Sequence, residues 1–218
     1  FGGPNGLQFF VEVLAITLFM MLVGRLGESS MVSSTLAFNV NTVVFFPILG
    51  LGTAVTTMVG KQLGNNRPDL ASRVTWTSYI LAVIYTAPLG FMYLLTPKVF
   101  LMGHAAGLGP QEFAELESTV AVLLRFVAFY VLFDTTAVVF VSAIKGAGDT
   151  NFVLITTAWT APLPLIVGAI GLRYFDLGLL WCWTVFSGWI CLVGLIYLFR
   201  FLGGKWKSML VIEASCDA

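Results

Sequence analysis

The chain alternates between long apolar runs and short polar links. Four of the runs carry no Asp, Glu, Lys or Arg over 23 to 32 consecutive residues, whereas roughly 20 apolar residues are enough for a helix to cross a bilayer core. Two further apolar segments, residues 1–24 and 118–144, carry one and two charged residues. The pattern therefore predicts an all-α membrane protein, a bundle of six transmembrane helices.

Glycine, proline and polar clusters between the runs set the expected boundaries. The six helices are expected at residues 6–24, 32–59, 74–95, 118–144, 152–172 and 177–201. Together they predict a six-helix transmembrane lobe over residues 1–202, followed by a cytoplasmic C-terminal tail over residues 203–218.

Prolines inside the runs predict local departures from straight helices, because proline removes one backbone hydrogen bond and its ring crowds the preceding turn. Pro47 should kink or tilt the second helix, and Pro162 and Pro164 should break or bend the fifth. Pro68 lies in the most polar link of the chain. There it suits the start of a short interfacial helix ahead of the third transmembrane helix.

Composition excludes a water-soluble domain. Hydrophobic residues make up 58% of the chain, charged residues make up 10%, and the mean hydropathy is +0.94, whereas an average soluble domain is roughly 25% charged. The net charge is zero, which gives no support for a nucleic-acid partner. The sequence also lacks a phosphate-binding loop, a serine nucleophile motif and a metal-ligand pattern, so we expect neither an enzyme nor a cofactor.

Basic residues are distributed unequally over the links between the expected helices. If six helices alternate across the membrane, seven basic residues fall on one side and three on the other. The larger set is Lys61, Arg67, Arg73, Lys145, Arg200, Lys205 and Lys207, and the smaller set is Arg25, Lys98 and Arg173. Because cytoplasmic links carry an excess of Lys and Arg, both termini are expected in the cytoplasm.

Two carboxylates lie deep inside the apolar segments. Glu12 is roughly 10 Å past the start of the first helix at 1.5 Å per residue, and Asp134 is near the midpoint of the fourth helix. A carboxylate at membrane depth is costly unless it is protonated, paired or solvated, so such a pair is suited to exchange a proton or a Na⁺ ion. The alternative is a structural pair bridged to the backbone or to Arg125, although Arg125 is expected to snorkel to the outer interface.

Other polar residues are candidates to line the same site. Tyr130 lies four residues before Asp134 on the same helix face, where it can hydrogen-bond the carboxylate or present its ring to a cation. An interfacial or packing role explains Tyr130 equally well. Thr35 and Asn39 share a face of the second helix and are candidate residues of a cavity or ion site. Hydrogen bonding between helices explains these two residues equally well.

Several short motifs occur in a specific order along the chain. The segments Gly3-Pro-Asn-Gly-Leu-Gln-Phe-Phe-Val-Glu12 and Pro47-Ile-Leu-Gly-Leu-Gly-Thr-Ala54 resemble parts of the seventh and eighth helices of the multidrug and toxic compound extrusion (MATE) family of transporters. Tyr130-Val-Leu-Phe-Asp134 and Ala143-Ile-Lys-Gly-Ala-Gly-Asp149 resemble its tenth helix and the exit from it. The order of the motifs is more specific than any single one, and the resemblance covers nearly the whole chain.

The resemblance implies the C-terminal six-helix lobe of a twelve-helix transporter in the bacterial plasma membrane. In the family, acids matching Glu12 and Asp134, with a tyrosine matching Tyr130 in some members, form the site that couples entry of Na⁺ or H⁺ to exit of a small organic substrate. The resemblance therefore implies that the coupling ion is Na⁺ or H⁺, and that Na⁺ would bind at Glu12 and Asp134. The N-terminal lobe is missing, so either the chain, which begins without Met, is a fragment or a second copy replaces that lobe.

We therefore expect one lobe of a secondary active antiporter, which exports lipophilic or cationic drugs and other toxic organic compounds in exchange for Na⁺ or H⁺. One alternative is a lipid-linked oligosaccharide flippase of the same superfamily, whose cavity should favour basic residues to hold pyrophosphate. Another alternative is a membrane channel or scaffold, in which the two acids are structural or line a pore.

Overall fold

The computed structural model describes residues 2–101 and 110–208, and these residues form helices and turns without a strand. Six segments within them are long and apolar enough to cross a membrane. The chain is therefore an all-helical, multi-pass membrane protein, as its apolar runs predict. Residues 209–218 of the expected tail lie outside the described residues.

The helices follow one another through short links. In chain order they are α1 (Gly2–Gly24), α2 (Glu28–Gly64), α3 (Pro68–Leu95), α4 (Pro97–Leu101), α5 (Pro110–Gly146), α6 (Thr150–Thr160), α7 (Leu163–Tyr174), α8 (Leu179–Leu202) and the 3₁₀ turn η2 (Lys205–Ser208).

Several helix ends differ from those expected. The helices expected at 32–59 and 118–144 are longer, since α2 and α5 each have 37 residues. Backbone hydrogen bonding continues there into polar turns that hydropathy assigns to links. The separate interfacial helix expected at Pro68 is wrong: Pro68 begins α3, which runs unbroken to Leu95, because proline at the first turn removes no helical hydrogen bond.

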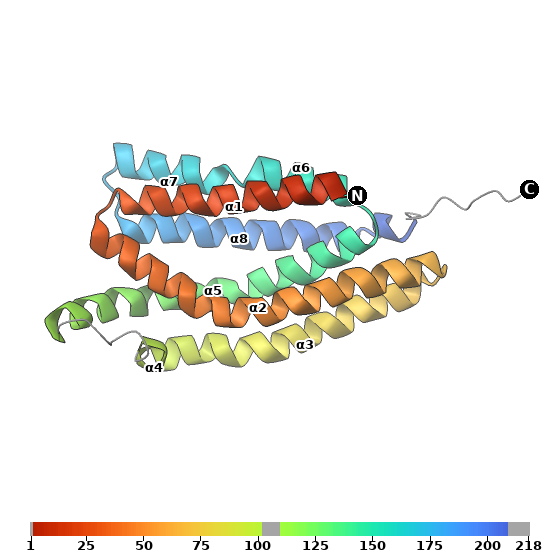
Figure 1. The fold of residues 1–218 in the computed structure, drawn as a ribbon, viewed down its shortest axis with the longest axis horizontal. Coiled ribbons are helices and arrows are strands. Elements are labelled where there is room, and N and C mark those ends of the chain that lie inside the picture. Colours follow the sequence, from red (N-terminus) through yellow and green to blue (C-terminus); the bar gives the residue numbers. More distant parts are fainter. Residues whose placement is uncertain (1, 102–109, 209–218) are drawn as a thin grey trace, which may run out of the picture.

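Prolines affect the helices differently. The helix expected at 152–172 is divided, with α6 ending at Thr160, α7 beginning at Leu163, and Ala161 and Pro162 between them. Pro47 lies inside α2 without ending it. Figure 1 shows that α2 changes direction along its length, which is the usual effect of a proline inside a helix.

α5 lies at the centre of the bundle and packs along α2, α3 and α8, whereas α1 packs against α6 and α7 (Figure 1). α5 contains the most buried of the six apolar segments. Small residues allow the helices to approach: a Cβ atom added to Gly194 of α8 would lie 2.6 Å from the carbonyl oxygen of Phe133 in α5. Such backbone proximity is typical of helices that pack together in membranes.

Candidate functional site

A cavity of about 520 Å³ lies between α5 and the helices α1, α2, α6 and α8. Most of its wall is aliphatic or aromatic. Among the described residues that line it, the charged side chains are Glu12, Asp134 and Lys145. An apolar cavity with a few polar groups inside is the usual form of a small-molecule site.

One face of α5 supplies a continuous stripe of cavity residues. Tyr130, Asp134, Val138, Val141 and Lys145 recur every three or four positions, so their side chains lie above one another along the helix. Tyr130 is only 1% exposed, and Asp134 is half-buried. Asp134 and Lys145 are separated by roughly 16 Å along the axis at 1.5 Å per residue.

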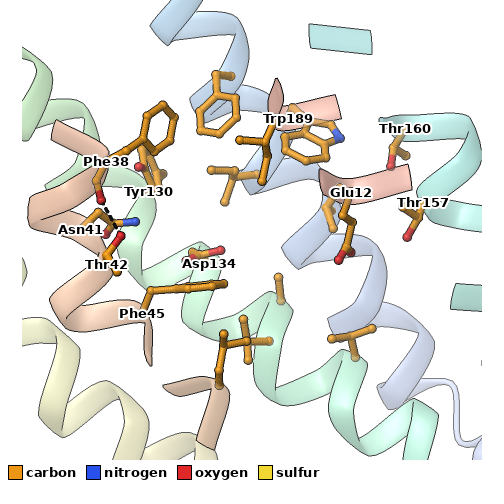
Figure 2. A pocket seen from close by; sticks show the side chains of 18 of the residues that line it. Glu12, Phe38, Asn41, Thr42, Phe45, Tyr130, Asp134, Thr157, Thr160 and Trp189 are labelled. Carbon is orange, nitrogen blue, oxygen red and sulfur yellow. Dashed lines mark hydrogen bonds between the residues drawn. The ribbon is translucent and has the colours of Figure 1, made fainter. Parts of the chain in front are cut away.

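α1 supplies the second acid. Glu12 lies near the middle of this helix, and the Gln8 side chain, one turn earlier, donates a hydrogen bond from Nε2 to Glu12 Oε1. Figure 2 shows Glu12 on the side of the cavity where Thr157 and Thr160 of α6 lie, with Asp134 placed separately. The fold thus brings the two acids into one cavity, but no hydrogen bond joins them.

α2 covers the side of the cavity nearer Asp134. Asn41, Thr42 and Phe45 line it there (Figure 2). The Thr42 hydroxyl donates to the Phe38 carbonyl oxygen at 2.9 Å, a bond that keeps this hydroxyl within its own helix. The side-chain oxygen of Asn41 is buried and has no hydrogen-bond partner in the described part of the chain, so it can accept a bond from a ligand or water.

Several buried polar atoms around the cavity have no hydrogen-bond partner within residues 2–101 and 110–208. They are Gln8 Oε1, Asn41 Oδ1, the Tyr130 hydroxyl and Trp189 Nε1. Folded proteins rarely leave buried polar groups unpaired, because each one loses its hydrogen bonds to water without replacement. This concentration of acceptors and donors favours a cavity that is filled by water, an ion or a polar ligand.

Of the other residues predicted from the sequence, some line the cavity and one does not. The Tyr130 hydroxyl makes no hydrogen bond to Asp134, so of its two expected contacts only the one between its ring and a cation remains available. Thr35 and Asn39 both line the cavity but are exposed, and the Thr35 hydroxyl donates to the Met31 carbonyl oxygen at 2.8 Å. Arg125 is exposed and does not line the cavity, so a bridge from it to either acid is not formed.

Lys145 is the cavity residue that sequence reasoning placed differently. It was expected in a link, among the basic residues of the cytoplasmic side, whereas the structure places it half-buried in the last turn of α5. Its spacing is the signal that identifies it: eleven residues after Asp134 are close to three full turns, which returns to the same helix face. Gln8 has a similar signal, four residues before Glu12.

Aromatic rings form the wall on the Asp134 side. Phe38 and Phe186 meet edge to face with ring centroids 5.5 Å apart, and Tyr130 and Phe186 do so at 6.1 Å. Ring faces attract organic cations, and most strongly where water is excluded. The arrangement therefore suits a flat, lipophilic cation held between rings and a carboxylate.

A small inorganic cation would find oxygen donors in the same place. Carboxylate, amide and hydroxyl oxygens are the ligands that hard cations prefer, and Asp134, Asn41 and Tyr130 offer one of each. The described residues contain no group of three or more His, Cys, Asp or Glu side chains suited to a metal ion. An ion held here would thus depend on neutral oxygens as well as carboxylates.

Comparison with known proteins identifies the family. The model of the MatE family matches residues 4–170, which is most of the chain. The chain belongs to the MatE family. Two of its curated relatives are each described as "Probable multidrug resistance protein NorM": the protein of Thermotoga maritima is 26% identical over 214 residues, and that of Brucella suis is 25% identical over 202 residues.

These alignments cover 97% and 91% of this MatE-family chain but 44% and 42% of the two relatives. The chain therefore spans less than half the length of the curated relatives it matches.

Solved structures of transporters share the fold. A crystal structure of MATE in the bent conformation matches with a TM-score of 0.81 at 16% identity, over 96% of this chain and 46% of that one. A transporter of the MOP superfamily from Pyrococcus furiosus, whose binding pocket is described as having reverse polarity, matches with a TM-score of 0.75 at 18% identity, over 97% of this chain and 45% of that one. The chain thus has the fold of about half of such a transporter.

Proposed function

We propose that this chain is one lobe of a cation-coupled exporter, which moves lipophilic or cationic organic compounds out of the cell in exchange for Na⁺ or H⁺. The observation that carries the proposal is that Glu12 and Asp134, from two apolar helices, line one cavity walled by aromatic rings. Such acids inside membrane segments are typical of ion and substrate pathways. Membership of the MatE family and relatives described as multidrug resistance proteins support export as the direction.

Competition between ion and substrate would provide the coupling. An organic cation binds between the rings near Asp134 while the cavity faces the cytoplasm. Once the cavity faces outward, Na⁺ or H⁺ at the two acids removes the charge that holds the substrate, and the substrate leaves. Coupling requires only that ion and substrate stabilise different conformations, since each ligand shifts the population toward the state it binds more tightly.

The remainder of the transporter is part of the proposal. A six-helix N-terminal lobe of the same protein, or a second copy of this chain, would cover the open side of the cavity. Both termini would lie in the cytoplasm of a bacterial cell, with the helices in its plasma membrane. The flippase alternative is less well supported, because one basic and two acidic side chains line the cavity in the described part of the chain.

The test removes each charge without changing side-chain size. In the complete product of the gene, Glu12→Gln and Asp134→Asn should each reduce export of a fluorescent cationic dye by at least tenfold while leaving the amount of protein in the membrane unchanged. Glu28→Gln and Asp69→Asn are matched controls. Both of these acids are exposed, in the first turns of α2 and α3, and neither lines the cavity.

Dye export should also stop when the opposing Na⁺ and H⁺ gradients are both collapsed by ionophores. Export at the wild-type rate by both cavity variants, or export that survives the loss of both gradients, would show that the acids do not couple ion entry to substrate exit.

A further inference from the structure

The position of Lys145 makes it part of the cavity's electrostatics. Its side chain is half-buried and lines the cavity from the last turn of α5, together with Glu12 of α1. No ion pair joins these two side chains, so both charges face the cavity without direct contact. Asp134 lies three turns before Lys145 on the same face of α5, so all three charged side chains line one cavity.

The next charged residue along the chain is paired elsewhere and does not balance Lys145. Asp149, which follows it by four residues, is held by the Arg200 guanidinium at 2.6 Å. Neither Asp149 nor Arg200 lines the cavity. In the described part of the chain, the charge of the cavity is therefore set by two carboxylates and one ammonium, which leave one net negative charge when all three are ionised.

We propose that Lys145 determines charge selectivity: it keeps one carboxylate balanced from within the protein, so the cavity accepts a single positive charge at a time and prefers organic monocations to dications. This inference rests on the proposed function and names its substrate class. Its physical reason is that an uncompensated charge is costly in a low-dielectric cavity, and an occupant that makes the total charge zero avoids this cost. A dication would leave one positive charge in excess beside Lys145.

Ethidium and propidium provide a direct test, because both carry the same phenanthridinium ring system and propidium has one additional quaternary ammonium. Binding of each dye to the purified complete gene product is measured by equilibrium dialysis, with no transport required. Lys145→Gln should raise the ratio of propidium to ethidium affinity by roughly three- to thirtyfold, the range expected from removing one nearby charge at intermediate dielectric. Lys145→Arg, which keeps the charge, should leave the ratio within about twofold of wild type.

Two further variants separate charge from shape. Lys61→Gln removes an exposed lysine from the last turn of α2, outside the cavity, and should leave the ratio unchanged. The double variant Glu12→Gln with Lys145→Gln again leaves one net negative charge, from Asp134, and should return the ratio toward the wild-type value.

A ratio that changes by less than twofold in Lys145→Gln would overturn the inference, as would an equal change in Lys145→Arg. Because the readout is binding, it is independent of coupling. If the coupling test fails but the affinity ratio shifts in Lys145→Gln, the proposed antiport is refuted and the charge selectivity is retained. If the coupling test succeeds but the ratio does not shift, only the charge selectivity is refuted.

Discussion

Gly146 of α5 lies directly against the backbone of Thr56 in α2. A Cβ atom added at position 146 would be 2.5 Å from the Thr56 carbonyl oxygen and 3.1 Å from its carbonyl carbon. The two helices therefore touch through their main chains one residue beyond Lys145, and this contact fixes where the end of α5 lies at the cavity.

Gly146→Ala should destabilise the protein, because its clash is with backbone atoms that a rotamer change cannot move. The expected loss is roughly 1–3 kcal/mol, as for other overpacked sites, seen as a lower melting temperature of the purified protein in detergent. Gly188→Ala in α8 is the matched control, since a Cβ atom there would have no atom of the described residues within 4 Å. Equal melting temperatures for the two variants would mean that α2 and α5 do not approach this closely.

The ion pair between Asp149 and Arg200 gives a second prediction. Arg200 donates from Nε and Nη2 to Asp149 Oδ2 at 2.9 and 2.6 Å, and its guanidinium lies 4.3 Å from the centre of the Phe152 ring. Arg200→Met should cost roughly 1–4 kcal/mol, less than for a fully buried pair because Arg200 is 21% exposed. Thermal unfolding in detergent measures the loss.

The cost should be smaller when both partners are changed. Asp149 is only 9% exposed, so Arg200→Met alone leaves a buried carboxylate without a partner, whereas adding Asp149→Asn removes that charge. Arg25→Met, at an exposed arginine in the link after α1, is the control for loss of a surface cation. A double variant less stable than Arg200→Met would contradict this explanation of the pair.

Tyr93 and Tyr130 are both buried, but only the Tyr93 hydroxyl makes a hydrogen bond within the described residues. Replacing each tyrosine by phenylalanine therefore compares a bonded hydroxyl with an unbonded one. The Tyr93 hydroxyl donates to the Val40 carbonyl oxygen at 3.2 Å, whereas the Tyr130 hydroxyl has no partner among the described residues. Without ligand, Tyr93→Phe should lower the free energy of unfolding by roughly 0.5–1.5 kcal/mol, and Tyr130→Phe should change it less or increase it.

Ligand binding should instead be affected by the Tyr130 substitution and not by the Tyr93 substitution. If the Tyr130 hydroxyl bonds to an occupant of the cavity, the rise in melting temperature caused by saturating ethidium will be smaller in Tyr130→Phe than in wild type and unchanged in Tyr93→Phe. Loss of ligand-free stability in Tyr130→Phe equal to that in Tyr93→Phe would indicate a structural hydrogen bond instead of a ligand contact.

The number of membrane segments was predictable because hydropathy measures apolar length directly. Helix ends were less predictable. The polar turns at the two ends of α2 (Glu28–Gly64) are helical by hydrogen bonding, but hydropathy detects only apolar residues and assigns them to links. Pro68 shows the same ambiguity, because a proline that can start a helix also suits the start of a separate, shorter one.

The cavity was predictable only in part. Glu12 and Asp134 were recognisable one at a time, since a charge in an apolar run is conspicuous, and the structure places both on one cavity. Lys145 was not, because a basic residue beside glycines at a helix end has the same pattern as an ordinary cytoplasmic link. Trp189 and the α6 threonines gave no signal, as similar residues recur throughout the apolar segments and only packing selects the ones that face inward.

The interruption between α6 and α7 has a consequence for hydration. Pro162 and Pro164 have no N–H group to offer the carbonyl oxygens of Ala158 and Thr160 four residues earlier. At membrane depth lipid cannot supply a replacement donor, whereas water in a cavity can. Because Thr160 lines the cavity on the side of Glu12, we expect water to reach this break in the helical hydrogen bonding.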